Sequence, residues 1–153
     1  MSLLHKIIER SEKILSGEAM ELLTFKAADE YFGMDARHVY RVVEDAKITP
    51  VPLAPQSHLG LMYYRGELFD VVDIVSLLGK RKEDLKDKYR IILVKWSDKK
   101  MALVPDGIVG LLWIEDGKNA DTVYTVGNYT ARRVTPEYIW STLLKLPYGP
   151  DKI

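Results

Sequence analysis

The chain has no cysteine among its 153 residues. Disulfides, thiolate metal sites and thiol catalysis are therefore excluded, and the absence fits a reducing cytoplasm. The sequence also lacks any run of about 18 apolar residues, which a membrane-spanning helix would need. Charged residues interrupt the apolar residues at the N-terminus, which argues against a signal peptide. We therefore expect a cytoplasmic protein with no direct membrane insertion.

An excess of charge of either sign is missing as well. Lysine plus arginine and aspartate plus glutamate each number 22, so the formal net charge is zero. Nothing attracts nucleic acid or an anionic membrane non-specifically, and we expect no nucleic-acid partner. Hydrophobic residues make up 47% of the chain, which predicts an ordinary globular core. A partner surface should then depend on shape, apolar contact and a few placed charges.

Motifs that carry catalysis or cofactor binding are also absent. The sequence has no P-loop, nucleophile elbow or dinucleotide fingerprint. His5, His38 and His58 are not at the spacing of metal ligands. Asp70 and Asp73 are three residues apart, which puts them on opposite faces of a strand rather than in a catalytic pair. We expect no enzyme, no cofactor and no metal, and a function in binding.

The N-terminal residues 1–18 predict an amphipathic helix over residues 2–16. Ser2 can cap its start and Gly17 can end it. The apolar residues that recur at helical spacing are Leu3, Leu4, Ile7, Ile8, Ile14 and Leu15. Two alternatives follow for this stripe: it packs on its own domain, or it associates with itself or with a partner helix.

Beyond residue 20 the pattern changes to short strands separated by turns. The expected strands cover residues 21–27, 31–34, 59–65, 67–74, 90–96, 101–104, 108–115, 123–126 and 129–133. Residues 35–44 suit a helical turn or a bent strand equally well. Residues 48–55 contain three prolines and predict an extended connection. Many short strands at this spacing predict small β-barrels.

Short helices and turns complete the expected elements. Asp73 is placed to cap a short helix over residues 74–78, and Pro136 starts a terminal helix over 137–145. Residues 80–88 form a charge-dense connector. Residues 97–100 and 116–119 predict turns, and residues 148–153 predict a loose tail.

Several segments together resemble the CheW family of chemotaxis adaptors. Residues 25–43 read FKAADEYFGMDARHVYRVV, and residues 48–55 read ITPVPLAP. Residues 58–74 read HLGLMYYRGELFDVVDI, which is similar to the family's Arg-Gly turn and the strand that follows it. Residues 90–94 and 102–108 resemble a third block. The combination covers about residues 21–115 and, more loosely, 122–146.

The resemblance implies both a fold and a function. The fold is mainly β, with two packed SH3-like five-stranded β-barrel lobes over residues 19–147, an added N-terminal helix and a C-terminal helix. The function is that of a non-catalytic adaptor in bacterial chemotaxis signal transduction. Such adaptors couple the cytoplasmic tip of a chemoreceptor, bound in an apolar groove, to the regulatory domain of a CheA-type histidine kinase.

The resemblance also implies protein-binding residues. Arg65 matches the family's turn arginine at the receptor-binding region, with a surface arginine bound to its own chain as the alternative. Val39 and Val42 match apolar positions at partner surfaces, with core packing as the alternative. Two positions depart from the family pattern: Arg41 stands where many members carry Glu, and a tyrosine pair ending at Tyr64 replaces Asn-Leu. Charge changes at such contacts reset specificity.

The C-terminal block, residues 132–140, also departs from the family pattern, because Pro136 falls where members continue a strand. A second hypothesis is therefore a divergent CheW-like scaffold for another signalling complex, which self-associates through its N-terminal helix into a homo-oligomer. A third is a small-molecule-binding or catalytic β-barrel. That hypothesis requires an enclosed pocket with converging polar groups.

Overall fold

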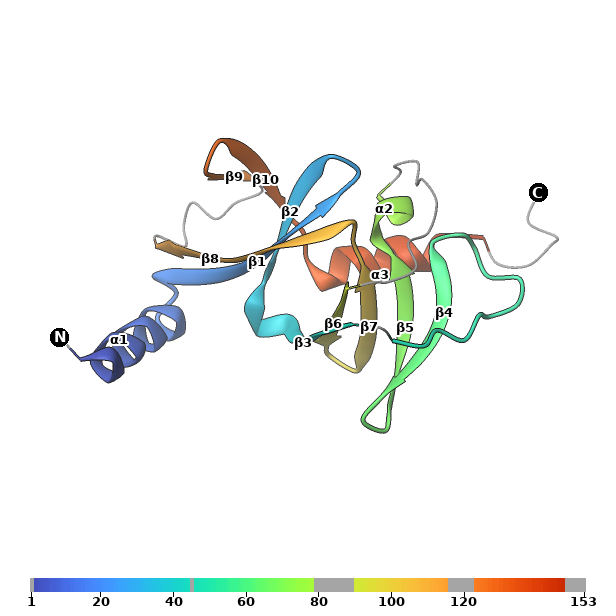
Figure 1. The fold of residues 1–153 in the computed structure, drawn as a ribbon, viewed down its shortest axis with the longest axis horizontal. Coiled ribbons are helices and arrows are strands. Elements are labelled where there is room, and N and C mark those ends of the chain that lie inside the picture. Colours follow the sequence, from blue (N-terminus) through green and yellow to red (C-terminus); the bar gives the residue numbers. More distant parts are fainter. Residues whose placement is uncertain (1, 45, 79–89, 116–122, 148–153) are drawn as a thin grey trace.

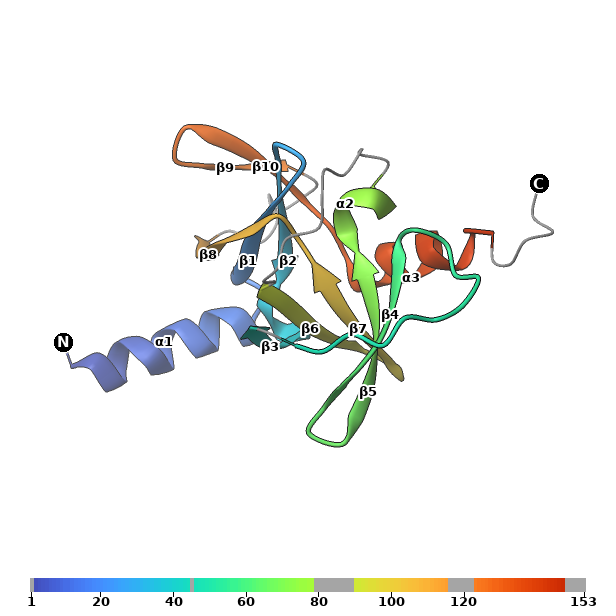
Figure 2. The same cartoon turned by 45° about the vertical axis from the view of Figure 1, so that its right-hand side comes forward.

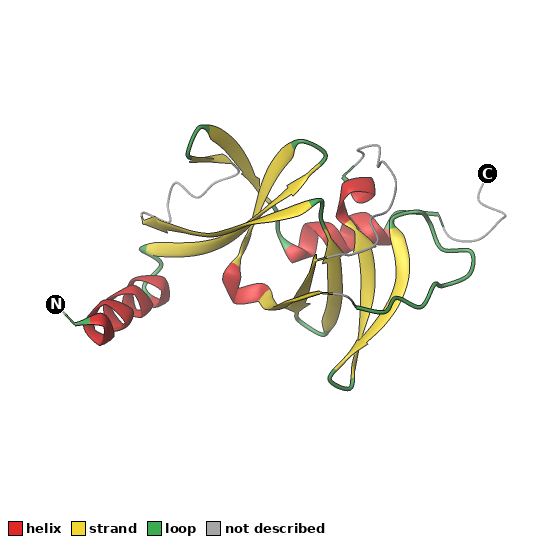
Figure 3. Cartoon of the chain, viewed as in Figure 1, coloured by secondary structure: helices red, strands yellow, loops and turns green. Residues whose placement is uncertain are grey.

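The order of helices and strands is taken from a computed structural model, which describes residues 2–44, 46–78, 90–115 and 123–147. Most described residues lie in strands, with helices at both ends and between strands (Figure 3). The elements are α1 (Leu3–Leu15), β1 (Ala19–Ala27), β2 (Glu30–Asp35), the 3-10 turn η1 (Ala36–His38), β3 (Val39–Glu44), β4 (His58–Tyr64), β5 (Glu67–Asp73), α2 (Ile74–Leu77), β6 (Arg90–Trp96), β7 (Lys99–Val104), β8 (Gly107–Glu115), β9 (Val123–Val126), β10 (Tyr129–Arg133) and α3 (Pro136–Leu144).

The strands form two five-stranded sheets (Figure 1). We call the sheet with the order β8-β1-β2-β10-β9 lobe A, and the sheet with the order β3-β6-β7-β5-β4 lobe B. The predicted mainly β fold with two five-stranded lobes, an N-terminal helix and a C-terminal helix is confirmed.

Each half of the chain supplies strands to both lobes. The hairpin β1–β2 lies in lobe A, but the next strand, β3, joins lobe B; the hairpin β6–β7 lies in lobe B, but β8 joins lobe A. Each half of the chain also contains a second hairpin, β4–β5 or β9–β10. The last strand of that hairpin pairs in parallel with a strand of the first hairpin in the same sheet: β5 pairs with β7, and β10 pairs with β2. Each later hairpin is followed by a helix, α2 or α3. The chain is thus built from two topologically equivalent halves that hold each other together.

The larger hydrophobic core lies between the two sheets. It unites strands of both lobes with α3, as the fully buried side chains of Phe25, Ile92 and Ile139 illustrate. A second cluster, which includes Phe69 and Leu93, lies in lobe B. Burial of each such side chain stabilises the fold by about 1.5–3 kcal/mol. The shared core therefore joins the lobes by packing as well as by strand exchange.

Lobe B curls until its two edge strands meet. The ring of Tyr40 on β3 lies 6.2 Å from the ring of Tyr64 on β4 and 6.5 Å from that of Phe69 on β5. The proline-rich connector runs along β4, where Thr49 and Leu61 exchange two backbone hydrogen bonds of 2.8 Å. The connector is extended at Thr49, as expected, but turns at residues 52–53, where Leu53 has a φ of 63°. At Thr49 it covers an edge that would otherwise be unpaired.

Local turn and cap chemistry explains the boundaries. The Asp73 side chain accepts hydrogen bonds from the backbone N–H groups that follow it and starts α2. Thr135 accepts from the Tyr138 N–H at 3.1 Å and caps α3. Pro136 therefore interrupts no strand, because it lies in the first turn of α3, after β10 has ended.

Two expectations change in detail. Residues 35–44, which the sequence left open, form η1 and then the strand β3. The second hairpin has a tighter tip than predicted, because β7 already begins at Lys99 and Ser97 adopts a positive φ of 56°. The charged connector 80–88, the turn 116–119 and the tail 148–153 lie outside the described residues.

Helix α1 projects away from both sheets (Figures 1 and 2). Ser2 caps it as predicted, and none of its residues is buried. It touches lobe A through polar side chains and Ile14: Arg10 lies 5.1 Å from the ring centroid of Trp113, Lys13 Nζ lies 3.2 Å from Glu115, and Ile14 is half-buried. The other stripe residues are exposed, so packing of the stripe on its own domain is limited to its C-terminal end. No helix in the described ranges is long and apolar enough to cross a membrane.

Candidate protein-binding site

An aromatic and cationic surface lies at one end of lobe B. The guanidinium carbons of Arg65 and Arg41 lie 5.3 and 6.0 Å from the centroid of the Tyr64 ring. Next to them, Lys95 Nζ lies 3.9 Å from the ring centroid of Tyr40. We call these five residues the Tyr64 cluster. The fold brings together side chains from β3, β4, the β4–β5 turn and β6.

The β4–β5 turn presents Arg65 in an unusual backbone conformation. Arg65 has φ 51° and Gly66 has φ 81°, the two positive values of a type I′ hairpin turn. Glycine adopts this conformation freely, but for arginine it costs about 1 kcal/mol. Ala28 and Asp29, at the β1–β2 turn, also have positive φ values of 50° and 67°, so this conformation follows from the tight hairpin and places Arg65 at its tip.

Lysines and a single carboxylate surround the cluster. Glu67 lies 2.7 Å from Lys95 and 3.3 Å from Lys100. The hydrogen bond from Lys95, followed by that from Lys100, lowers the pKa of the Glu67 carboxyl. Glu67 thus stays ionised and orders the two lysines, while Arg41 and Arg65 face the Tyr64 ring.

Exposed apolar side chains lie on the opposite face of the same hairpin. Tyr63 and Leu68, which face each other across the β4–β5 hairpin, are 73% and 43% exposed. Arginine and tyrosine dominate the energetically important centres of protein interfaces. The surface therefore has the composition to bind a helical or extended partner that carries carboxylates.

The predicted site residues divide into two groups. Arg41, Tyr64 and Arg65 come together, whereas Val39 and Val42 are half-buried and pack against the core between the sheets. Tyr64 instead packs against the second cluster within lobe B. The two valines are thus placed to support β3, and they do not extend the Tyr64 cluster.

Tyr40 and Lys95 are members of the cluster that the sequence did not indicate. A β-bulge between Val39 and Arg41 breaks the alternation of β3, so that Tyr40 and Arg41 are both exposed. The only local signal was the run of Tyr and Arg before two valines. Lys95 comes from a different half of the chain and gave no signal.

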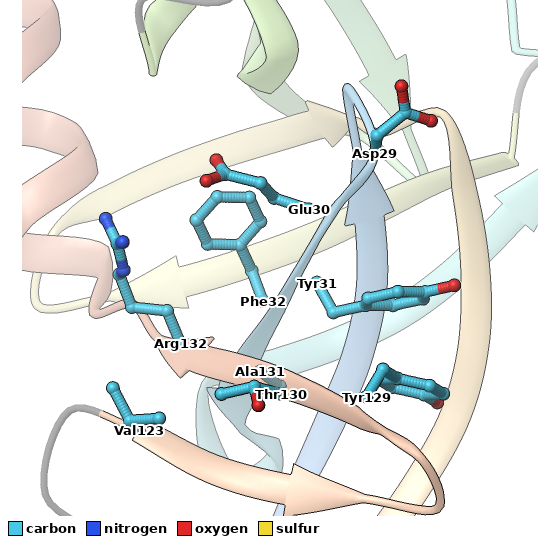
Figure 4. Close-up of a pocket in the computed structure, with 9 residues that line it drawn as sticks. All are labelled: Asp29, Glu30, Tyr31, Phe32, Val123, Tyr129, Thr130, Ala131 and Arg132. Atoms are coloured by element: carbon cyan, nitrogen blue, oxygen red, sulfur yellow. The ribbon is translucent and has the colours of Figure 1, made fainter.

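A cavity of about 370 Å³ lies in lobe A, between the β1–β2 turn, β2, β9 and β10 (Figure 4). The rings of Tyr31 and Tyr129 stack on one side at 3.8 Å. Figure 4 shows Glu30 and Arg132 on one side and Asp29 on the other, so their charged groups do not converge. Small-molecule recognition needs such convergence. Within the described ranges, no three His, Asp or Glu side chains gather where a metal ion would be held.

The chain was compared with protein families and curated proteins. The family model described as "CheW-like domain" matches residues 21–132. Chemotaxis protein CheW of Thermotoga maritima is 28% identical over 98 residues, which are 64% of each chain. Chemotaxis protein CheW of Rhizobium meliloti is 26% identical over 68% of this chain and 67% of that protein. Protein FrzA of Myxococcus xanthus is 25% identical over 60% of this chain and 57% of that protein.

A solved structure shows the same fold. The crystal structure of scaffolding protein TtCheW from Thermoanaerobacter tengcongensis matches with a TM-score of 0.70 at 22% identity, over 78% of this chain and 91% of that one. The alignments with the Thermotoga and Myxococcus relatives span less than two thirds of those proteins' lengths.

Proposed function

Because the chain belongs to the CheW-like domain family, we propose that it is a non-catalytic adaptor of chemotaxis signalling in the bacterial cytoplasm. Its proposed partners are the cytoplasmic tip of a chemoreceptor and the regulatory domain of a CheA-type histidine kinase. The observation that carries the proposal is the Tyr64 cluster, which gathers around the Arg-Gly turn that the family resemblance assigns to receptor binding.

The proposed mechanism is binding alone. The planar guanidinium groups of Arg41 and Arg65 can each bind a carboxylate with two hydrogen bonds while Tyr64 supplies apolar area. An adaptor changes kinase activity only if it binds two states of the assembly with different affinity. The cationic cluster therefore binds one state of the partner surface more tightly than the other.

Isothermal calorimetry with the purified receptor tip and kinase regulatory domain tests the proposal. We expect both to bind, and Arg65→Ala to weaken receptor binding at least tenfold, as loss of an interface arginine does. Arg90→Ala is the matched control, because Arg90 is a half-exposed arginine at the start of β6, paired with Glu44. No binding of either partner at about 1 mM, a weak but measurable affinity, would contradict the adaptor function.

One observation favours the second candidate function, a divergent scaffold that self-associates. The apolar stripe of α1 is exposed, with Leu3 75% and Leu15 87% accessible. Sedimentation of the full chain against a chain that lacks residues 1–18 tests this candidate. Equal masses for the two would rule out assembly through α1.

A further inference from the structure

The apolar stripe of α1 has different charges along its two edges. At about 100° per residue, the stripe that includes Leu4, Ile7 and Ile8 is centred near Ser11. Arg10 lies on one edge, and Glu12 lies on the other. Lys6 follows Arg10 around the helix, so one edge is basic and the other carries a carboxylate.

The edge charges favour a protein helix rather than a lipid surface as the partner of the stripe. A helix that lies on a membrane carries lysine and arginine around its polar face, whereas the Glu12 carboxylate here would approach anionic lipid. A 13-residue helix is also marginal in water without packing, and lobe A covers only Ile14 of the stripe and leaves Leu4, Ile7 and Ile8 exposed. A helix with complementary edges suits this stripe better than lipid.

We propose that α1 pairs in parallel with α1 of a second copy of this chain. A parallel pair places the basic edge of each helix opposite the acidic edge of the other, as e and g positions do in parallel coiled coils. Arg10 and Glu12 are two residues apart, an axial offset of about 3 Å, so a parallel pair in register keeps the basic and the acidic edge at nearly the same height along the helices. An antiparallel pair instead opposes like edges.

The lobes leave room for this pairing. Arg10 and Lys13 contact lobe A on the basic side of α1, and of the stripe only Ile14 is half-buried there. A two-fold axis along the helix pair then puts the second lobe on the opposite side. The Tyr64 cluster belongs to lobe B and stays outside the pair, so the dimer presents two such clusters and can bind a partner array with avidity.

Single cysteines test the orientation, because the chain has none of its own. Leu4 and Leu15 lie at opposite ends of the stripe and are 67% and 87% exposed. Under mild oxidation, a parallel pair links Leu4→Cys to itself and gives little product between Leu4→Cys and Leu15→Cys in a mixture. Predominant mixed product would show an antiparallel pair and overturn the proposal.

Sedimentation over a concentration series tests the pairing itself. We expect the mass to rise from 17.5 kDa towards twice that value, and Ile7→Asp to abolish the rise. Glu9→Gln is the control on the opposite side of α1. A wild-type chain that stays monomeric at about 200 μM, well above the concentration at which a micromolar dimer forms, would overturn the proposal, whether or not it floats with anionic vesicles.

Charge reversals separate the edge contacts from the stripe. Glu12→Arg gives both edges one sign and should weaken a parallel dimer about tenfold, whereas Glu9→Arg, on the opposite side of α1, should leave the dimer unchanged. An equal dissociation constant for all three chains would overturn the parallel arrangement. Receptor and kinase binding by Ile7→Asp, measured by calorimetry, distinguishes failure of the pairing from failure of the adaptor function.

Discussion

Gly33 on β2 lies beneath the hydroxyl of Tyr124, which reaches across from β9 to Thr24 on β1. The Tyr124 and Thr24 hydroxyl oxygens are 3.1 Å apart, although β10 and β2 lie between their strands in the sheet. A Cβ at Gly33 would overlap the Tyr124 ring. The glycine thus leaves the space that lets one side chain connect β9 to β1 across the two strands between them.

Gly33→Ala should therefore lower the free energy of unfolding by about 1–3 kcal/mol, the usual cost of overpacking. In a Tyr124→Ala background the same change should cost less than about 1 kcal/mol, because the overlapping ring is gone. Urea denaturation of the four chains in this cycle measures both values. Equal costs in the two backgrounds would show that the Tyr124 ring is not the cause.

Asp35 is a residue whose ionisation is controlled by its neighbours. It accepts hydrogen bonds from the Arg37 N–H at 2.9 Å and from Arg37 Nη2 at 2.6 Å. Burial opposes ionisation, but the hydrogen bonds from Arg37 outweigh it and lower the pKa of the Asp35 carboxyl below its ordinary value of 3.8. The ionised form is thus favoured by folding, and its contribution is lost as the pH falls below 3.8.

We expect Asp35→Asn to lower the free energy of unfolding by about 1–3 kcal/mol at pH 7, since a charged hydrogen-bonding partner is lost. The difference from wild type should shrink as the pH falls from 3.8 towards the lower pKa of the folded state. Chemical denaturation at a series of pH values measures this. Asp98→Asn is the control, because Asp98 is 81% exposed; a pH-independent difference for Asp35→Asn would contradict the assignment.

At the scale of elements, hairpins could be predicted from the sequence because their signals are local. Turn residues at Arg65-Gly66 and the Asp73 cap lie within a few residues of the structure they form. Strand β3 could not be assigned, because its valines suit a helix or a strand and its pairing partner β6 is distant in the sequence. Local sequence patterns also could not predict that β3 joins lobe B and β8 joins lobe A.

The same limit applied to the binding site. Arg65 was indicated as a match to the family pattern, and Arg41 and Tyr64 as departures from it, but their contact depends on the curl of lobe B and on the bulge in β3. Val39 and Val42 look alike in sequence whether they face a partner or the core. Only the register with β6 shows that they support the core between the sheets.

At the β4–β5 turn, one substitution at Arg65 should change stability and receptor affinity in opposite directions. Asn-Gly fits a type I′ turn better than Arg-Gly, so Arg65→Asn should raise the free energy of unfolding by about 0.5–1 kcal/mol. The same change should weaken receptor binding, because the guanidinium is removed. Urea denaturation and calorimetry on one sample check both, and stabilisation without loss of binding would remove Arg65 from the site.

For the whole molecule, strand exchange and the shared core make the two lobes one cooperative unit. Each lobe contains strands from both halves of the chain, and α3 packs between the sheets. Neither sheet is complete without both halves. Unfolding of one lobe must therefore disrupt both halves of the chain and expose the core that the two sheets share.

Ile92→Ala, on β6 in lobe B, should then destabilise both lobes together by about 2–5 kcal/mol, since the removed side chain is only 1% exposed in the shared core. Trp96 reports on lobe B and Trp113 on lobe A. Fluorescence is measured on two chains, one that keeps only Trp96 and one that keeps only Trp113. Both should show the same urea midpoint, and Ile92→Ala should shift the two midpoints equally. Val109→Ala on the exposed surface of β8 is the control. A shift at Trp96 alone would mean that the lobes unfold separately and that strand exchange does not couple them.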